Sequence, residues 1–137
     1  MFQLAYASLA WPPFSKANVE NILTVSRQKN REHGITGVLL YTSGSVVQVL
    51  EGEEADVRQL YTNIERDSRH CDVTLIYTRT IGAREFPDWT MGFNCVELSW
   101  EKHPEGFNPV FHEPGRLKAS GRGTAVLKSF LESNRPS

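Results

Sequence analysis

Apolar and polar residues along the first 34 positions follow two different periods. Residues 2–8 (FQLAYAS) alternate between the two faces of a strand, and the prolines at positions 12 and 13 end this pattern. Between Ser15 and Gly34, apolar side chains instead recur every three or four residues. This spacing predicts a helix that Ser15 caps and Gly34 closes.

A hairpin, a second helix and two further strands are predicted from the following residues. Gly44 is the expected turn residue of the hairpin, because glycine tolerates the backbone angles of a tight turn. The second helix is amphipathic, with acidic residues near its N-terminal end. The expected ranges are 35–41 and 45–52 for the hairpin strands, 53–67 for the helix, and 72–80 and 91–98 for the last strands.

The order of these elements predicts one α+β domain. A βαββαββ order is typical of a ferredoxin-like, mostly antiparallel sheet that carries both helices on one face. We therefore expect one domain over residues 1–98. Residues 99–137 are rich in proline, glycine and histidine, and we expect them to form a C-terminal extension on the other face, with one helix near 123–133.

One predicted strand contains a polar residue that its apolar neighbours do not explain. In SVVQVLEG (45–52), Gln48 shares a face with Val46 and Leu50, so its amide points into the predicted core. A buried amide without a partner costs about 1 to 3 kcal/mol. The fold must therefore supply a hydrogen-bonding partner for Gln48.

Three other uncharged polar side chains are expected to face the same gap between the sheet and the helices. Tyr6 lies on the first strand, and Ser26 and Asn30 follow Ile22 at four-residue spacing on the first helix. A bond to the backbone or to a neighbour would explain each of them alone. Burial of four such groups on one side of a sheet is costly for a plain core, however. Together with apolar walls from Ile22 and Ile64, they suit a flat heteroaromatic ligand such as flavin.

Composition and charge narrow the classes of function. The chain has 137 residues, enough for one domain, and its net charge of −1 does not favour nucleic acid as a partner. It has no apolar run long enough to span a membrane and no signal sequence, and its two cysteines lack a Cys-x-x-Cys spacing, so we expect a cytoplasmic protein. Common catalytic motifs and metal-ligand spacings are missing, so we expect neither an enzyme nor a metal site.

Several segments, in their order along the chain, resemble the BLUF family of blue-light sensors that use flavin. These segments are LAYAS, SRQKN followed by GITGVLLY, VVQVLEG, LYTNIERDSRH and FPDWTM. The resemblance spans roughly residues 2–97. It implies the ferredoxin-like fold already predicted, with the flavin ring of FAD between the two helices.

The resemblance also implies roles for individual residues. Tyr6 would be the photochemical tyrosine, Gln48 the switching glutamine and Asn30 the asparagine that bonds the edge of the flavin ring. Trp89 and Met91 would compete for a place beside Gln48. With the polar and apolar residues identified above, the expected flavin-binding set is Tyr6, Ile22, Ser26, Lys29, Asn30, Gln48, Ile64, Asp67, Arg69 and His70.

The implied function is that of a blue-light photoreceptor that binds FAD non-covalently and signals to a downstream protein. FMN and riboflavin are alternatives, because a site that holds the ring leaves the rest of the cofactor mostly outside. Two residues depart from the family pattern. Lys29 stands where many members have asparagine, and Asn63 stands where several have arginine. We expect a homo-oligomer, although no residue sets its size. The alternative function is a small flavin-dependent redox enzyme or a light-regulated enzyme subunit.

Overall fold

The computed structural model describes residues 1–10, 16–42, 44–68, 70–87, 92–95 and 122–133. Each predicted strand and helix is found within these ranges, with ends that move by up to three residues. The elements are β1 (Phe2–Ala10), α1 (Lys16–His33), β2 (Thr36–Thr42), β3 (Ser45–Gly52), α2 (Glu54–Glu65), β4 (His70–Thr80), β5 (Gly92–Cys95) and α3 (Arg122–Ser133).

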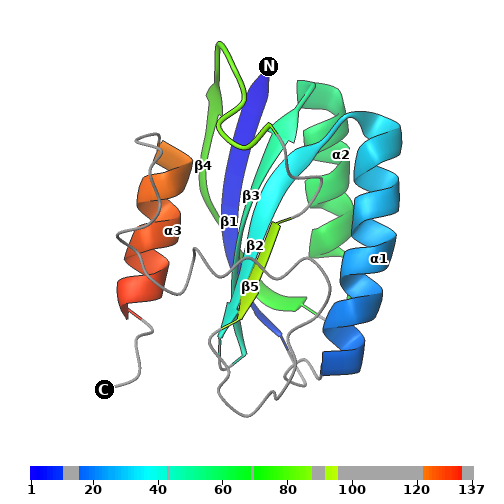
Figure 1. Cartoon of the computed structure of the whole chain (residues 1–137), viewed down its shortest axis with the longest axis vertical. Coiled ribbons are helices and arrows are strands. Elements are labelled where there is room, and N and C mark those ends of the chain that lie inside the picture. The colour runs from blue at the N-terminus through cyan, green and yellow to red at the C-terminus, as the bar shows by residue number, and fades with distance from the viewer. Residues whose placement is uncertain (11–15, 43, 69, 88–91, 96–121, 134–137) are drawn as a thin grey trace.

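The strands form a single sheet in the order β4-β1-β3-β2-β5. β1 pairs antiparallel with β3 and β4, β2 pairs antiparallel with β3, and β5 lies parallel to β2. Helices α1 and α2 cover one face of this sheet, and α3 lies on the opposite face (Figure 1). The elements from β1 to β4 thus have the ferredoxin-like βαββαβ arrangement, so the predicted α+β fold is confirmed.

Strand pairing places Tyr6 and Gln48 side by side in the middle of the sheet. The two residues are direct partners in the antiparallel register of β1 and β3. Gly44, with a φ of +87°, lies at the turn that joins β2 to β3, a conformation that residues with a Cβ atom rarely adopt. This turn sets the register of the hairpin, and the alternation along β3 then directs Gln48 toward α1 and α2.

The two faces of the sheet support two separate apolar cores. Successive side chains along each strand point to opposite faces, and the central strands carry apolar side chains on both. The core under α1 and α2 contains Phe2, Leu4, Tyr6, Leu23, Ile35, Leu39, Tyr41, Val46, Leu50 and Val57. The core under α3 contains Ala5, Val38, Leu40, Val47, Val49, Phe86 and Leu127.

Each helix packs on the sheet through a narrow side. Leu23 and Asn30 of α1, Val57 of α2 and Leu127 of α3 are buried. Most other described helix residues are exposed or half-buried, as expected for amphipathic helices on the surface of a small domain. No described helix is both long enough and apolar enough to cross a membrane.

Candidate functional site

A cavity lies between α1, α2 and the helix-covered face of the sheet. The cavity has a volume of about 150 Å³, and its mouth is open to solvent. Strands contribute its floor and the helices its sides. The lining residues are Tyr6, Ile22, Val25, Ser26, Lys29, Asn30, Leu39, Gln48, Leu60, Asn63, Ile64 and Asp67.

The structure brings together most of the residues that were predicted to bind flavin. Arg69, Trp89 and Met91 lie outside the described residues, as does the side chain of His70, so their placement stays a prediction. The predicted residues that line the cavity are Tyr6, Ile22, Ser26, Lys29, Asn30, Gln48, Ile64 and Asp67.

Four lining residues were not in the predicted set: Val25, Leu39, Leu60 and Asn63. Leu39 pairs with Gln48 across β2 and β3, so the alternation of the hairpin could have identified it. Leu60 lies on the apolar face of α2, between Val57 and Ile64, so its helical spacing could also have identified it as a lining residue. Val25 is 45% exposed, and only the shape of the cavity assigns it to the site.

A buried hydrogen bond joins the two polar residues on the cavity floor. The Tyr6 hydroxyl donates to Oε1 of Gln48. Tyr6 is fully buried and Gln48 is only 5% exposed. The polar partner that the buried amide of Gln48 required is therefore, at least in part, the Tyr6 phenol.

The surroundings of Tyr6 keep its phenol neutral. Burial raises the pKa of Tyr6 well above its ordinary value, and Tyr61 and Asp67 add to this effect. The ring of Tyr61 lies with its centroid 5.6 Å from that of Tyr6, at an interplanar angle of 57°. Because the hydroxyl keeps its proton, it serves as a hydrogen-bond donor throughout the physiological pH range.

Apolar side chains from both helices border the polar groups. Ile22 of α1 and Ile64 of α2 are half-buried and both line the cavity. The four-residue spacing from Ile22 through Ser26 to Asn30 places these three residues along one side of α1. Asn30 is 1% exposed, so its amide lies inside rather than at the helix surface.

The combination of groups fits a planar, uncharged ligand with a polar edge. Three amides and a neutral phenol offer donors and acceptors, while the isoleucines offer contact to the faces of a ring. No group of three or more His, Cys, Asp or Glu side chains that could hold a metal ion occurs among the described residues. The amides, the phenol and the isoleucines together therefore suit the edge and faces of a flavin ring.

Comparison with known proteins supports this interpretation. The model of the BLUF family, described as sensors of blue light using FAD, matches residues 1–92. Over 96 residues the chain is 37% identical to the photoactivated adenylate cyclase subunit beta of Euglena gracilis. The aligned region covers 69% of this chain and 11% of the Euglena protein. The chain thus spans about a tenth of the length of this curated relative.

Solved structures show the same fold. A bacterial light-regulated adenylyl cyclase superposes with a TM-score of 0.69 at 30% identity, over 97% of this chain and 33% of the cyclase chain. BlrB, a BLUF protein solved in its dark state, superposes with a TM-score of 0.69 at 27% identity, over 96% of both chains. With a family model that matches residues 1–92, this chain belongs to the BLUF family, the sensors of blue light using FAD.

Proposed function

We propose that the cavity binds FAD non-covalently and that light changes the hydrogen bond between Tyr6 and Gln48. The bond between these two side chains on the cavity floor carries the proposal. Ile22 and Ile64 would contact the two faces of the ring, and Asn30 would bond its polar edge. Lys29 and Asp67, which also line the cavity, would lie near its periphery.

Tyr6 is the proposed electron donor. Bound flavin supplies the absorption of blue light and a strong, short-lived oxidising power. A phenol that loses an electron becomes a strong acid, so Tyr6 gives up its hydroxyl proton with the electron. Its hydrogen bond to Oε1 of Gln48 makes that oxygen the first acceptor on the path of the proton. Return of one electron and one proton restores the phenol.

Gln48 is the proposed switch. Its side chain has an acceptor end and a donor end on one uncharged group, so rotation or tautomerisation reverses the hydrogen-bond pattern without moving net charge. Reversal without a change of charge avoids the large cost of moving a charge within a buried site. If the new arrangement donates to the carbonyl edge of the ring, the absorption of the bound flavin moves to longer wavelength.

The proposed output passes from the sensor to a partner. We assign residues 1–98 to the flavin-binding sensor and 99–137 to an extension that takes part in the output. Trp89 and Met91, which precede β5, are proposed to report the state of Gln48, and Arg69 and His70 to contact the flavin beyond α2. A downstream protein, a homo-oligomeric state and a cytoplasmic location stay predictions.

Absorption spectroscopy tests the proposed function directly. Purified protein should be yellow and should show a reversible red shift under blue light, and Tyr6→Phe should abolish the shift without loss of colour. Tyr61→Phe is the matched control, because Tyr61 is only half-buried beside Tyr6. A colourless protein that takes up no added flavin, or a full photocycle in Tyr6→Phe, would contradict the proposal. Chromatography of the extracted cofactor distinguishes FAD from FMN and riboflavin.

A light-regulated enzyme subunit is the second candidate. The similar Euglena protein is a photoactivated adenylate cyclase subunit, and the match covers 11% of it. A redox enzyme with a nicotinamide substrate would be bleached by NADH in the dark, whereas a sensor would keep its oxidised spectrum. The same spectra, recorded with and without NADH, therefore separate a sensor from a redox enzyme.

A further inference from the structure

A second cluster of polar side chains is buried on the face of the sheet that α3 covers. We call it the Gln3 cluster: Gln3, Glu51, Tyr77, Arg79 and Glu85. Nε2 of Gln3 donates to Oε2 of Glu51 at 2.8 Å and to Oε1 of Glu85 at 3.2 Å. Its Oε1 accepts from the Tyr77 hydroxyl at 2.6 Å and from Nε of Arg79 at 2.9 Å. Gln3 and Glu51 are both fully buried.

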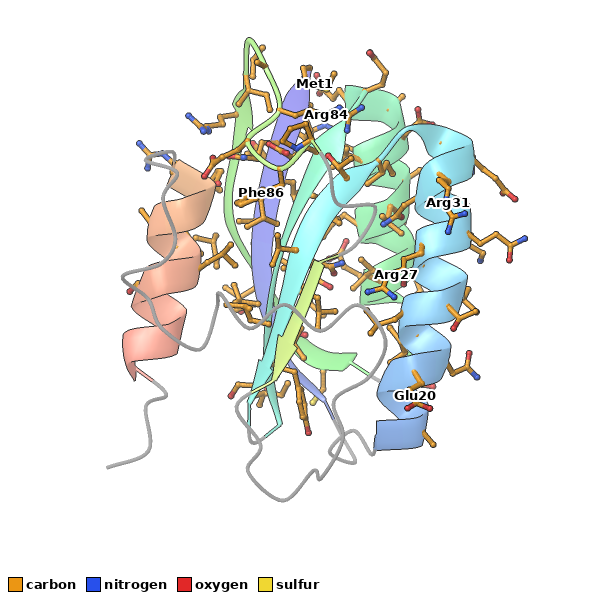
Figure 2. All side chains as sticks on the ribbon, in the orientation of Figure 1. Met1, Glu20, Arg27, Arg31, Arg84 and Phe86 are labelled. Atoms are coloured by element: carbon orange, nitrogen blue, oxygen red, sulfur yellow. The ribbon has the colours of Figure 1, made fainter. Side chains whose placement is uncertain are left out.

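The buried carboxylate of Glu51 bonds the backbone of the segment that follows β4. Its carboxylate accepts from the backbone N–H of Glu85 at 2.8 Å and from that of Phe86 at 2.7 Å. Figure 2 shows Phe86 on the α3 side of the sheet and Arg84 at the end of the sheet near Met1. A buried carboxylate with several N–H donors forms strong, charge-assisted hydrogen bonds, so β3 and this segment are closely coupled.

Glu85 in turn holds the first turn of α3. The backbone N–H of Gly123, one of the N-terminal donors that a helix cannot satisfy by itself, bonds to Oε1 of Glu85 at 3.2 Å. The Arg122 guanidinium lies 5.7 Å from the centre of the Tyr77 ring. The polar end of α3 is thus attached to the Gln3 cluster.

The residue at position 123 has to be small for this attachment. A Cβ atom there would lie 3.1 Å from Oε1 of Glu85, 3.1 Å from Cε2 of Phe86 and 3.2 Å from Nε2 of Gln3. These distances are tighter than ordinary carbon contacts, so the neighbouring atoms would have to shift by a few tenths of an ångström. The side chains of Gln3 and Glu85 are held by hydrogen bonds within the cluster, so a branched side chain at position 123 would strain the contact between α3 and the sheet.

One turn further along, apolar contacts complete the attachment. Leu127 is fully buried and packs with Val47, Val49 and Phe86 in the second core, and Val126 packs against its edge. Val47 and Val49 flank Gln48 in β3, and Glu51 follows three residues later. β3 therefore carries Gln48 on one face. On its other face it carries the valines that pack with Leu127, and also Glu51, which bonds the backbone of the segment after β4.

We propose that the contact between Glu85 and Gly123 is a latch that holds α3 on the sheet, and that movement of β3 at Gln48 opens it. The light-dependent part rests on the proposed function, whereas the latch itself does not. In the open state α3 leaves the second core, and in the closed state Gly123 and Leu127 return to the positions described here. α3 is then the element whose two positions carry the signal.

Hydrogen exchange of the α3 amides tests the latch in darkness. In Gly123→Val, exchange within residues 123–133 should accelerate by about tenfold, because overpacking at this contact weakens the attachment of α3. Gly82→Val is the matched control, since a Cβ atom at Gly82 meets nothing within 4 Å. Glu85→Ala should accelerate exchange in the same segment, with α1 unchanged. Equal α3 exchange in wild type and both variants would overturn the latch.

Illumination tests the coupling. In wild type, blue light should accelerate α3 exchange at least about fivefold, a usual lower bound for an allosteric coupling, and Gln48→Leu should remove this difference. If the red shift occurs but α3 exchange is the same in light and darkness, the coupling is wrong while the proposed function stands. If the red shift itself is absent, the proposed function fails, and the dark measurements still decide the latch.

Discussion

Two glutamines on neighbouring strands, Gln48 and Gln3, show how the environment decides whether an amide is fixed or able to turn. Both are buried, on opposite faces of one sheet. Three of the four partners of Gln3 have a single role here: Arg79 can only donate, and the carboxylate oxygens of Glu51 and Glu85 accept. The fourth partner is the Tyr77 hydroxyl, which donates to Oε1 of Gln3. Turning the Gln3 amide by 180° would set donor against donor and acceptor against acceptor.

Gln48 bonds a tyrosine hydroxyl on the cavity floor. The Tyr6 hydroxyl donates to Oε1 of Gln48, but a hydroxyl can also accept, so it can bond either end of the amide. Gln48 also lines the cavity, where a ligand edge with both donors and acceptors would bond either orientation. The same type of side chain thus joins several segments on one face and is the proposed switch on the other.

Replacement of Gln48 should give the largest effect on the light response. Gln48→Leu removes both ends of the amide, so we expect complete loss of the red shift in absorption spectra. The free energy of unfolding, measured by urea denaturation of the flavin-free protein, should change by less than about 2 kcal/mol, because a leucine keeps most of the packing. Persistence of the red shift in Gln48→Leu would show that the amide is not the switch.

Replacement of Gln3 should give the opposite result. Gln3→Leu leaves the buried carboxylate of Glu51 without its amide donor and the Tyr77 hydroxyl and Arg79 guanidinium without their acceptor. We expect a loss of about 3 to 5 kcal/mol in the free energy of unfolding, with the red shift kept where the protein is folded. Gln59→Leu, on the exposed side of α2, is the control and should be nearly neutral.

A smaller loss of stability is expected when Glu51 becomes an amide. In Glu51→Gln, one end of the side chain presents an NH2 group to a backbone N–H of Glu85 or Phe86. We expect a loss of about 2 kcal/mol in urea denaturation. Glu53→Gln is the matched control, because Glu53 is exposed and its side chain makes no capping bond to α2. Equal stability of the two variants would contradict the role assigned to Glu51.

The smallest effect concerns the pH dependence of stability. Burial, together with Glu85, raises the pKa of Tyr77 to about 12 from its ordinary value of 10.0. Between pH 10 and 12 the unfolded chain has lost this proton while the folded chain keeps it, so stability falls as pH rises. Tyr77→Phe should cost about 1 kcal/mol at pH 7 and should make this alkaline fall shallower, as measured by urea midpoints. An unchanged slope would indicate that Tyr77 ionises normally.

The sequence predicts the cavity face better than the opposite face. Tyr6, Gln48, Ser26 and Asn30 stand out because they are polar residues at positions where a regular period calls for apolar ones. Glu51 stands at the end of a strand, where a charged residue is ordinary, and its complete burial has no signature in the pattern. Gln3 likewise reads as an ordinary outward-facing residue of the first strand.

The order of the elements, the face on which Gln48 lies and the family follow from the sequence alone, since these depend on local periodicity and on short segments of chain. The assembly of the Gln3 cluster depends on the folded chain, because its members come from β1, β3, β4 and the segment after β4, and no local period links them. The distances between these separate segments are set by strand register and by the packing of Leu127. These long-range contacts hold the amide of Gln3 in one orientation.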